Sequence, residues 1–185
     1  MKPNMIVFMG GQGSGKGTFA HKLLECRDLN YVEAGAILRQ MPADSEIGKK
    51  VANGVLIDDK DLFAMISQHI TTTKDIILDG FPRTVSQAKW LVDNYADKFN
   101  IQIVFLNIPE STMIAHIKKR VCEGGNRKDD TDENAVRKRI ESFKSATMPA
   151  IQWLANIDSI KFFDIKLPGD DICENFEHIM RTIGQ

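Results

Sequence analysis

The sequence predicts an α/β fold in which helices cover both faces of a doubly wound, five-stranded parallel sheet. Short apolar segments alternate with longer ones whose apolar residues recur at helical spacing, a pattern typical of right-handed βαβ units. Residues 101–107 are almost uninterruptedly apolar, as a strand covered on both faces requires. The chain has 185 residues, 43% of them hydrophobic, so we expect residues 1–185 to form a single domain.

The first half of the chain contains the first three expected strands, at residues 5–9, 31–32 and 75–78. Helices are expected at residues 19–25, 36–41 and 45–54, and from residue 58 onward. Pro42 ends the second of these helices, and Ser45 is a suitable N-cap for the third. The fourth places apolar residues on one face, with Asp59 and Asp61 near its positive end.

The second half adds strands at residues 101–107 and 161–165. Helices are expected around residues 90–95, from 109 to 121, from 131 or 132 in pieces to 154, and after residues 169–171. Residues 123–130 contain no apolar side chain and are predicted to form a mobile surface loop.

A glycine-rich segment follows the first expected strand directly, with the sequence GGQGSGKGT at residues 10–18. Such a loop at the start of a helix brings backbone N–H groups to a phosphate, and Lys16 adds a cation. A flexible linker would not sit between a buried strand and an amphipathic helix. A dinucleotide-binding fingerprint fails because its third glycine would fall on Lys16 or Thr18. The segment therefore predicts a loop that binds a nucleoside polyphosphate.

A second polar motif, Asp79-Gly80-Phe81-Pro82-Arg83, follows the third expected strand. Parallel strands end at the same edge of a sheet, so we expect this motif and the glycine-rich loop to face one crevice. Arg83, on a loop fixed by Pro82, is predicted to bind phosphate. Asp79 is predicted to order magnesium-bound water, the alternative being a strand-end cap.

Arginines lie in or beside the polar loops, at positions 39, 83, 120, 127, 137 and 139. Phosphoryl transfer needs cations around the moving group and exclusion of water, which favours a flap that closes on a small phosphorylated ligand. A solvated basic face is the alternative. A nucleic-acid patch is disfavoured because acidic residues are interleaved, at positions 123, 129, 130, 132 and 133.

The composition excludes other classes of function. The net charge of −1 argues against nonspecific nucleic-acid binding, and no apolar run approaches membrane-spanning length. Cys26, Cys122 and Cys173 are too far apart for a CxxC motif, so we expect ordinary thiols in a cytoplasmic protein. The histidines, His116 among them, are expected to be surface residues.

Together these motifs resemble the adenylate kinase family along essentially the whole chain. The segments Gly10–Thr18 and Asp79–Thr84 match its two best-known signatures, and residues 127–130 with 137–139 resemble its lid and the helix after it. The resemblance implies a P-loop nucleoside monophosphate kinase with a mobile monophosphate-binding flap (33–61) and a short lid (121–131). It further implies a monomer that uses Mg²⁺ with ATP, AMP and ADP, without zinc.

The resemblance also implies a role for each matching residue. The catalytic set is Lys16, Arg83, Arg120, Arg127 and Arg139. The ATP-binding set is Gly13, Ser14, Gly15, Lys16, Gly17, Thr18, Arg120 and Gly169. The AMP-binding set is Gly35, Arg39, Val55, Leu56, Ile57, Gly80, Phe81, Pro82, Arg83, Gln87, Arg127 and Arg139, with Gln87 reading the adenine edge. Asp79 would bind Mg²⁺ through water.

The chain departs from the family pattern at a few positions. Ala34 and Ala36 stand where a threonine and an aspartate are usual, His116 replaces an arginine, and Gln12 replaces a common proline. The expected reaction is reversible phosphoryl transfer from Mg-ATP to AMP, giving two ADP. The alternatives are a UMP/CMP-type kinase and a nucleotide-binding regulatory protein with weakened catalysis. Thr84 and Gln87 favour AMP.

Overall fold

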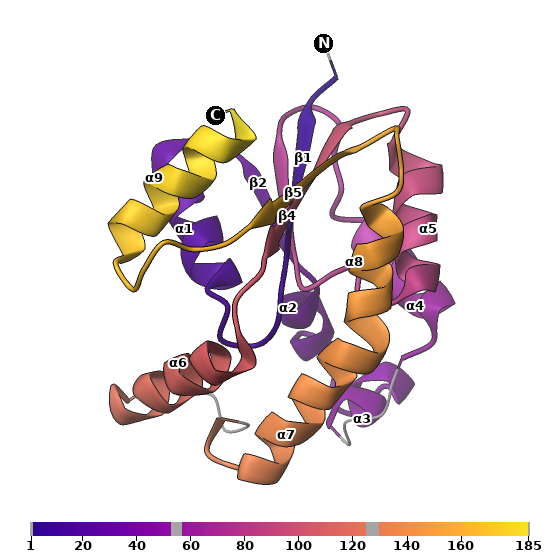
Figure 1. Ribbon diagram of the computed structural model, residues 1–185. Helices are drawn as coiled ribbons and strands as arrows, with labels where there is room; N and C mark the ends of the chain where they lie inside the picture. Colours follow the sequence, from indigo (N-terminus) through magenta and orange to yellow (C-terminus); the bar gives the residue numbers. More distant parts are fainter. Residues whose placement is uncertain (1, 53–56, 125–129, 185) are drawn as a thin grey trace.

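The computed structural model describes residues 2–52, 57–124 and 130–184, which build one twisted parallel sheet between two helical layers (Figure 1). The strands are β1 (Asn4–Met9), β2 (Asn30–Glu33), β3 (Ile76–Asp79), β4 (Asn100–Leu106) and β5 (Lys161–Ile165). Their order in the sheet is β2-β3-β1-β4-β5, and every pairing is parallel. The predicted doubly wound, five-stranded α/β fold is confirmed.

Alternating side chains of the strands pack into two separate hydrophobic cores, because successive residues of a strand point to opposite faces of the sheet. Ile6 and Phe8 of β1 pack with α1 (Lys16–Cys26) and α9 (Ile172–Ile183). Met5, Val7 and Met9 face the other layer, formed by α2 (Ala34–Arg39), α4 (Asp59–Ser67), α5 (Val85–Tyr95) and α8 (Met148–Leu154). Burial on both faces explains why β1 and β4 are largely apolar, with Asn4, Asn100 and Gln102 as their polar residues.

The remaining helices gather near the carboxyl ends of the strands (Figure 1). They are α3 (Glu46–Ala52), α6 (Glu110–Cys122) and α7 (Glu133–Ser142). The Ser45 hydroxyl accepts a hydrogen bond from the Gly48 N–H, as expected of a cap, and the Asp132 carboxylate caps α7 by accepting from the Asn134 N–H.

The long helix expected after residue 131 is indeed divided into pieces. A π-helical turn, η2 (Phe143–Thr147), separates α7 from α8. Pro149 lies at the start of α8, where its missing N–H is tolerated, whereas inside a helix it would remove a hydrogen bond. The helical ribbon is continuous through this turn, so that α8 packs on α5 while α7 extends toward the carboxyl edge of the sheet (Figure 1).

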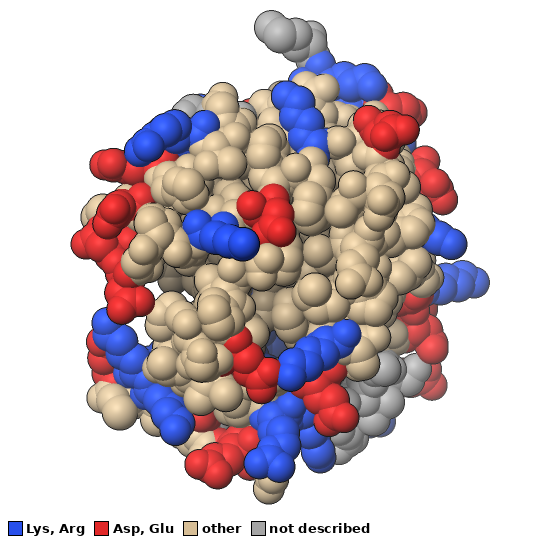
Figure 2. Space-filling model, viewed as in Figure 1, with Lys and Arg blue, Asp and Glu red and all other residues tan. Residues whose placement is uncertain are grey.

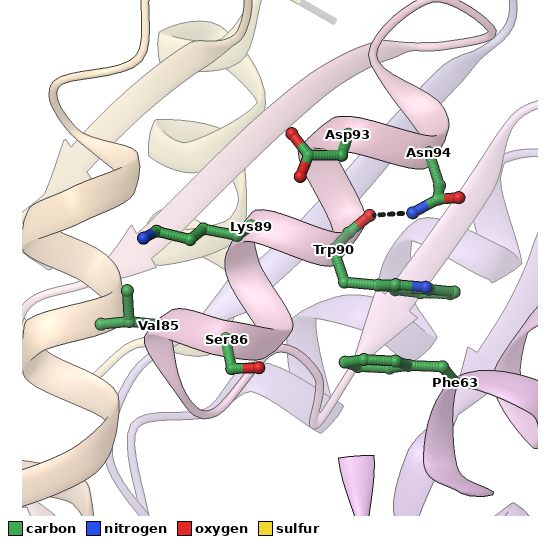
Figure 3. Close-up of a pocket in the computed structure, with 7 residues that line it drawn as sticks. All are labelled: Phe63, Val85, Ser86, Lys89, Trp90, Asp93 and Asn94. Atoms are coloured by element: carbon green, nitrogen blue, oxygen red, sulfur yellow. Dashed lines mark hydrogen bonds between the residues drawn. The ribbon is translucent and has the colours of Figure 1, made fainter. Parts of the chain in front are cut away.

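A shallow groove of about 500 Å³ runs along α5 and is bordered by an aromatic stack (Figure 3). The rings of Phe63 and Trp90 are parallel within 4°, with centroids 4.4 Å apart. Trp90 packs against the core, as its sequence context predicts, but remains half-buried. None of the predicted nucleotide-binding residues that the structure describes lines this groove.

Candidate active site

The glycine-rich loop and Asp79 lie side by side at the carboxyl edge of the sheet. Strand β1 leads into the loop, and Phe8 is in register with Asp79 on β3. A Cβ atom built on Gly17 would lie 3.8 Å from Oδ2 of Asp79. The structure therefore brings together the two motifs that the sequence predicts to share a crevice.

The loop needs glycine at position 13 for two separate reasons. Gly13 has a φ of +81°, which L side chains rarely adopt, and a Cβ there would lie 2.5 Å from the backbone oxygen of Met113. The Ser14 N–H donates to the Gly11 carbonyl at 3.2 Å, which closes a turn with Gln12 and Gly13 at its centre. The loop is thus packed tightly against α6.

The Lys16 side chain folds back over the loop at the start of α1. Its Nζ donates to the carbonyl oxygens of Gly10 and Gly11, each at 2.8 Å, and lies 3.3 Å from the Ser14 hydroxyl. Ser14 is buried, whereas Thr18 is exposed. The ammonium group is therefore held directly beside the backbone groups that are predicted to cradle phosphate.

The Asp79 carboxylate is 9% exposed and accepts a hydrogen bond from the Tyr31 hydroxyl at 3.1 Å. Across the described ranges 2–52, 57–124 and 130–184, no three His, Cys, Asp or Glu side chains form a metal-binding group. Magnesium retains several waters and takes one or two carboxylates together with substrate phosphates. A single carboxylate beside a phosphate loop fits that ion.

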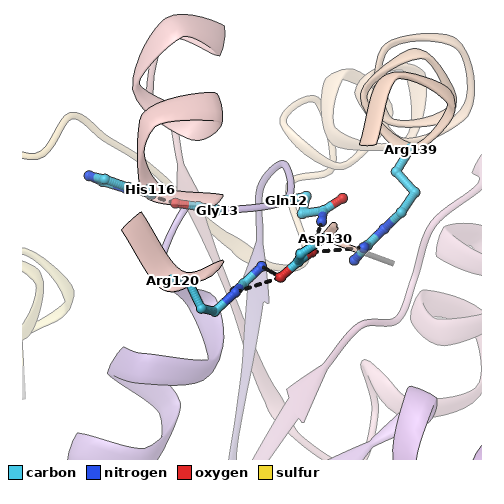
Figure 4. Close-up of polar contacts among 6 residues, drawn as sticks. All are labelled: Gln12, Gly13, His116, Arg120, Asp130 and Arg139. Atoms are coloured by element: carbon cyan, nitrogen blue, oxygen red, sulfur yellow. Dashed lines mark hydrogen bonds and ion pairs between the residues drawn. The ribbon is translucent and has the colours of Figure 1, made fainter. Parts of the chain in front are cut away.

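Four side chains from three distant segments meet at what we call the arginine–aspartate cluster: Gln12, Arg120, Asp130 and Arg139 (Figure 4). Arg120 of α6 donates from Nε to Asp130 Oδ2 at 2.7 Å, with Nη2 at 2.6 Å. Arg139 of α7 donates from Nη1 to Oδ1 at 3.3 Å, and Gln12 of the loop donates from Nε2 to the same oxygen at 2.6 Å.

The Asp130 side chain is only 1% exposed, because each carboxylate oxygen has two nitrogen neighbours. A buried carboxylate is stable only when it is paired in this way. The cluster gathers two guanidinium groups next to the phosphate loop, so it can stabilise charge on a transferring phosphoryl group. Arg127, the third arginine predicted here, lies outside the described residues.

Two more of the predicted arginines lie on what we call the acceptor side: Arg39 is the last residue of α2, and Arg83 follows β3. Arg39 forms an ion pair with Glu33 at 2.7 Å, with side chains 63% and 26% exposed. A Cβ on Gly35 would lie 2.9 Å from Nη1 of Arg39, and one on Gly80 would lie 3.4 Å from Nη2 of Arg83. Both guanidinium groups therefore lie close to a glycine, where a larger residue would compete with them for space.

The side-chain amide of Gln87 forms two hydrogen bonds within the protein. The side chain is 7% exposed; Oε1 accepts from the Arg83 N–H at 2.8 Å and Nε2 donates to Asp59 Oδ1 at 2.9 Å. Each end of the amide keeps a second hydrogen-bonding site, so these two bonds are compatible with a role in reading the adenine edge. Phe81 and Pro82 are buried, Ile57 packs against the core, and Val55 and Leu56 lie outside the described residues.

A cavity of about 630 Å³ opens on the other side of the glycine-rich loop, and it contains the predicted ATP-binding residue Gly169. Its lining comprises Asn107, Ile108, Pro109, Thr112, His116, Lys166, Leu167, Gly169 and Asp170. The His116 ring bonds from Nδ1 to the Gly13 carbonyl at 2.8 Å, and its Nε2 lies 3.9 Å from Asp170 Oδ1. A planar base beside the phosphate loop would fit this cavity.

Comparison with known proteins agrees with these observations. A family model for adenylate kinase matches residues 8–158. The chain belongs to the adenylate kinase family. The adenylate kinases of Bacteroides thetaiotaomicron and Phocaeicola vulgatus are each 34% identical over 161 residues, which cover 82% of this chain and 84% of the relative. That of Agrobacterium fabrum is 31% identical over 189 residues, covering 95% and 96%.

Membership of the adenylate kinase family confirms the resemblance, the P-loop nucleoside monophosphate kinase fold and the prediction of an enzyme. The roles of individual residues stay predictions. Within residues 2–52, 57–124 and 130–184, no helix is both long and apolar enough to span a membrane.

Three features of the site were missed by the sequence analysis. Asp130 was counted among acidic residues that oppose a polyanion, yet it is buried between arginines. His116 is expected from the sequence only to lie at the surface, and its bond to the glycine-rich loop was not foreseen. Glu33, which pairs with Arg39, was not singled out. The one available signal was the position of Asp130 beside several arginines.

Proposed function

We propose that this protein transfers a phosphoryl group reversibly from Mg-ATP to AMP, giving two ADP, and so contributes to adenine nucleotide homeostasis. One observation carries the proposal. A phosphate loop, the arginine–aspartate cluster and the acceptor-side arginines all lie at the carboxyl edge of one sheet. That arrangement supports two phosphorylated ligands meeting in one crevice.

On the donor side, residues 13–18 bind the phosphates of ATP through backbone N–H groups and the Lys16 ammonium. This ammonium bonds the carbonyls of Gly10 and Gly11, which holds it beside the N–H groups proposed to bind the phosphates. The cavity lined by His116 and Gly169 accepts the base of the donor.

On the acceptor side, Arg39 and Arg83 bind the AMP phosphate. One of its oxygens attacks the γ-phosphorus of ATP, and the bond from that phosphorus to the bridging oxygen of ADP breaks. The acceptor phosphate is already a nucleophile, so positioning and charge stabilisation can carry the reaction without a protein base.

Arg120, Arg127 and Arg139 stabilise the charge of the transferring group. The Mg²⁺ that accompanies ATP neutralises charge on the donor phosphates when bound. Asp79 holds that ion through water, from its place beside Gly17 and the start of α1. The buried position of Asp79 and its bond from Tyr31 keep the carboxylate in one orientation.

Residues 33–61 and 121–131 act as the flap and the lid of this proposal and close over the nucleotides, which excludes water from the reacting group. The protein works as a cytoplasmic monomer on adenine nucleotides. The interspersed basic and acidic side chains of the face in Figure 2 suit such small ligands better than a polyanion.

The alternatives are less well supported. The named relatives are adenylate kinases, which favours AMP over UMP or CMP as the acceptor. Loss of catalysis, suggested by Ala34, Ala36 and His116, is opposed by the described phosphate-binding residues, because Lys16, Arg120 and Arg139 are all positioned beside the loop or the cluster.

The test is a coupled assay of ADP formation with Mg-ATP and AMP, CMP, UMP or dTMP as acceptor. The proposal expects the highest kcat/KM with AMP. A preference for a pyrimidine would contradict the acceptor assignment. Binding of ATP by calorimetry with negligible turnover on every acceptor would support the regulatory alternative instead.

A further inference from the structure

The arginine–aspartate cluster contains one residue that the family resemblance does not explain, Gln12. We propose that Gln12 is a positioning residue, which couples the phosphate loop to Arg120 and Arg139 through the Asp130 carboxylate. The inference rests on the proposed function, because it assigns a role within that same phosphoryl-transfer site.

The first argument is the backbone at Gln12. The Ser14 N–H bonds the Gly11 carbonyl, and Gly13 has a φ of +81°, which together describe a turn with Gln12 in its second position. Proline is favoured at that position because its fixed φ suits the turn. A proline has no side-chain donor. Glutamine lacks the fixed φ of proline, but it places a side-chain amide at this position of the turn.

The second argument is the direction of the amide. Only Nε2 can donate to a carboxylate, and it lies 2.6 Å from Asp130 Oδ1, a residue 118 positions away in the chain. Within the described part of the chain, the other end of the amide, Oε1, is buried without a hydrogen-bond partner. Leaving a buried acceptor unpaired is costly, so the bond to Asp130 determines how this side chain lies.

The third argument is the division of the carboxylate between its partners. Oδ2 is occupied by Arg120, while Oδ1 is shared by Gln12 at 2.6 Å and Arg139 at 3.3 Å. Gln12 is therefore the closer partner on Oδ1, and it holds the carboxylate toward the phosphate loop (Figure 4). Being neutral, it does so without altering the charge that the two arginines present.

The loop is rigid enough to act as an anchor. A Cβ on Gly11 would lie 2.1 Å from the Met113 sulfur of α6 and 3.4 Å from Phe143 of η2, so the tip is wedged between these elements. A fixed loop, a short hydrogen bond and a paired carboxylate form a continuous connection from the donor phosphates to the arginines. Preorganised charges of this kind act mainly on the transition state.

The first experiment compares Gln12→Met, which keeps the length but lacks the donor, with Gln12→Pro, which suits the turn and also lacks it. We expect kcat to fall by about 3- to 10-fold in both, with each KM within about twofold of wild type, since transition-state stabilisation is lost. Gln152→Met, an exposed glutamine of α8, is the matched control and should behave as wild type. Thermal unfolding confirms that each variant is folded.

An exchange of donor and acceptor separates positioning from simple packing. Gln12→Glu places an acceptor against the Asp130 carboxylate and should lower kcat more than Gln12→Met. In the double variant Gln12→Glu/Asp130→Asn the bond can form in reverse, so kcat should exceed the product of the two single effects by at least about threefold. A kcat within twofold of wild type in Gln12→Met and Gln12→Pro overturns the proposal, as does a double variant without recovery.

The Nε–H resonance of Arg120 gives a readout that is independent of turnover. In Gln12→Met its exchange with solvent should be faster than in wild type, because the carboxylate that it bonds is held less firmly; unchanged exchange counts against the proposal. A wild-type protein that forms no ADP with any acceptor defeats the proposed function. An active wild type with unaltered Gln12 variants defeats only this inference.

Discussion

On one side of the crevice, which we call the transfer side, side chains of the glycine-rich loop, α6 and α7 meet around the buried Asp130 carboxylate. On the acceptor side, Arg39 pairs with Glu33, which is only six residues away in the chain. The first arrangement needs the whole fold to be in place. The second is local, and its arginine is largely exposed to solvent.

This difference indicates which kinetic constant each side of the crevice should affect. Charges that are fixed before the ligand arrives stabilise the transition state, because no reorganisation is needed at the moment of transfer. An exposed ion pair contributes little and is readily exchanged for a stronger phosphate partner. We therefore expect changes on the transfer side to alter kcat, and changes on the acceptor side to alter the KM for AMP.

The largest expected effect is that of Lys16→Met on the transfer side. Removing the ammonium proposed to bind the donor phosphates should lower kcat by about 10³-fold, as for loss of a single charge-stabilising donor. Steady-state rates with Mg-ATP and AMP measure this, with Lys138→Met, an exposed lysine of α7, as control. A Lys16→Met enzyme within tenfold of wild type would show that the ammonium is not part of the transfer site.

The packing of the glycine-rich loop gives the next largest effect. Gly13 and Gly124 both have a φ of +81°, but a Cβ would meet the Met113 backbone at the first and, among the described residues, nothing within 4 Å at the second. Gly13→Ala should lower the free energy of unfolding by about 3 kcal/mol, and Gly124→Ala by only about 1 kcal/mol, the cost of the left-handed backbone alone. Urea unfolding followed by circular dichroism measures both. Equal losses would mean that the close approach to α6 is unimportant.

On the acceptor side, Arg39→Ala removes one of the two proposed ligands of the AMP phosphate. The KM for AMP should rise by about 30-fold, because a charge-assisted hydrogen bond is lost, while the KM for ATP changes little. Varying AMP at saturating Mg-ATP tests this. An equal rise in both KM values would place Arg39 outside the acceptor side.

The smallest effect is expected for Glu33→Gln, which removes the carboxylate that pairs with Arg39. Since exposed pairs are worth at most about 1 kcal/mol, the KM for AMP should fall by about two- to fivefold, with kcat unchanged. Glu46→Gln on α3 serves as the control. A higher KM for AMP would show that Glu33 supports the binding of AMP and does not compete with it.

Much of the fold and part of the site could be predicted from the sequence for physical reasons that are local. Strands that are covered on both faces must be largely apolar. The glycine-rich loop is recognisable because a strand directly precedes it and a helix directly follows it in the sequence. The meeting of that loop with Asp79 followed from the parallel order of strands, since such strands end at the same edge.

The rest depended on contacts between distant segments, which local patterns do not encode. The arginines near Asp130 in the sequence indicate possible partners, but they do not distinguish a solvated carboxylate from one buried between Arg120 and Arg139. Likewise, the amide of Gln87 could be assigned to a base, but its bond to Asp59 is made with another helix. The charge pattern predicted that a phosphate site is present, but it did not predict which side chains of the site pair with one another.

The central claim is that the Asp130 carboxylate organises the transfer side independently of the acceptor side. It is tested most directly by steady-state kinetics of Asp130→Asn, with AMP and Mg-ATP varied separately. Because the variant weakens the hold on both arginines, we predict that kcat falls by at least about tenfold while the KM for AMP stays within about twofold of wild type. An unchanged kcat with a raised KM for AMP would contradict the account.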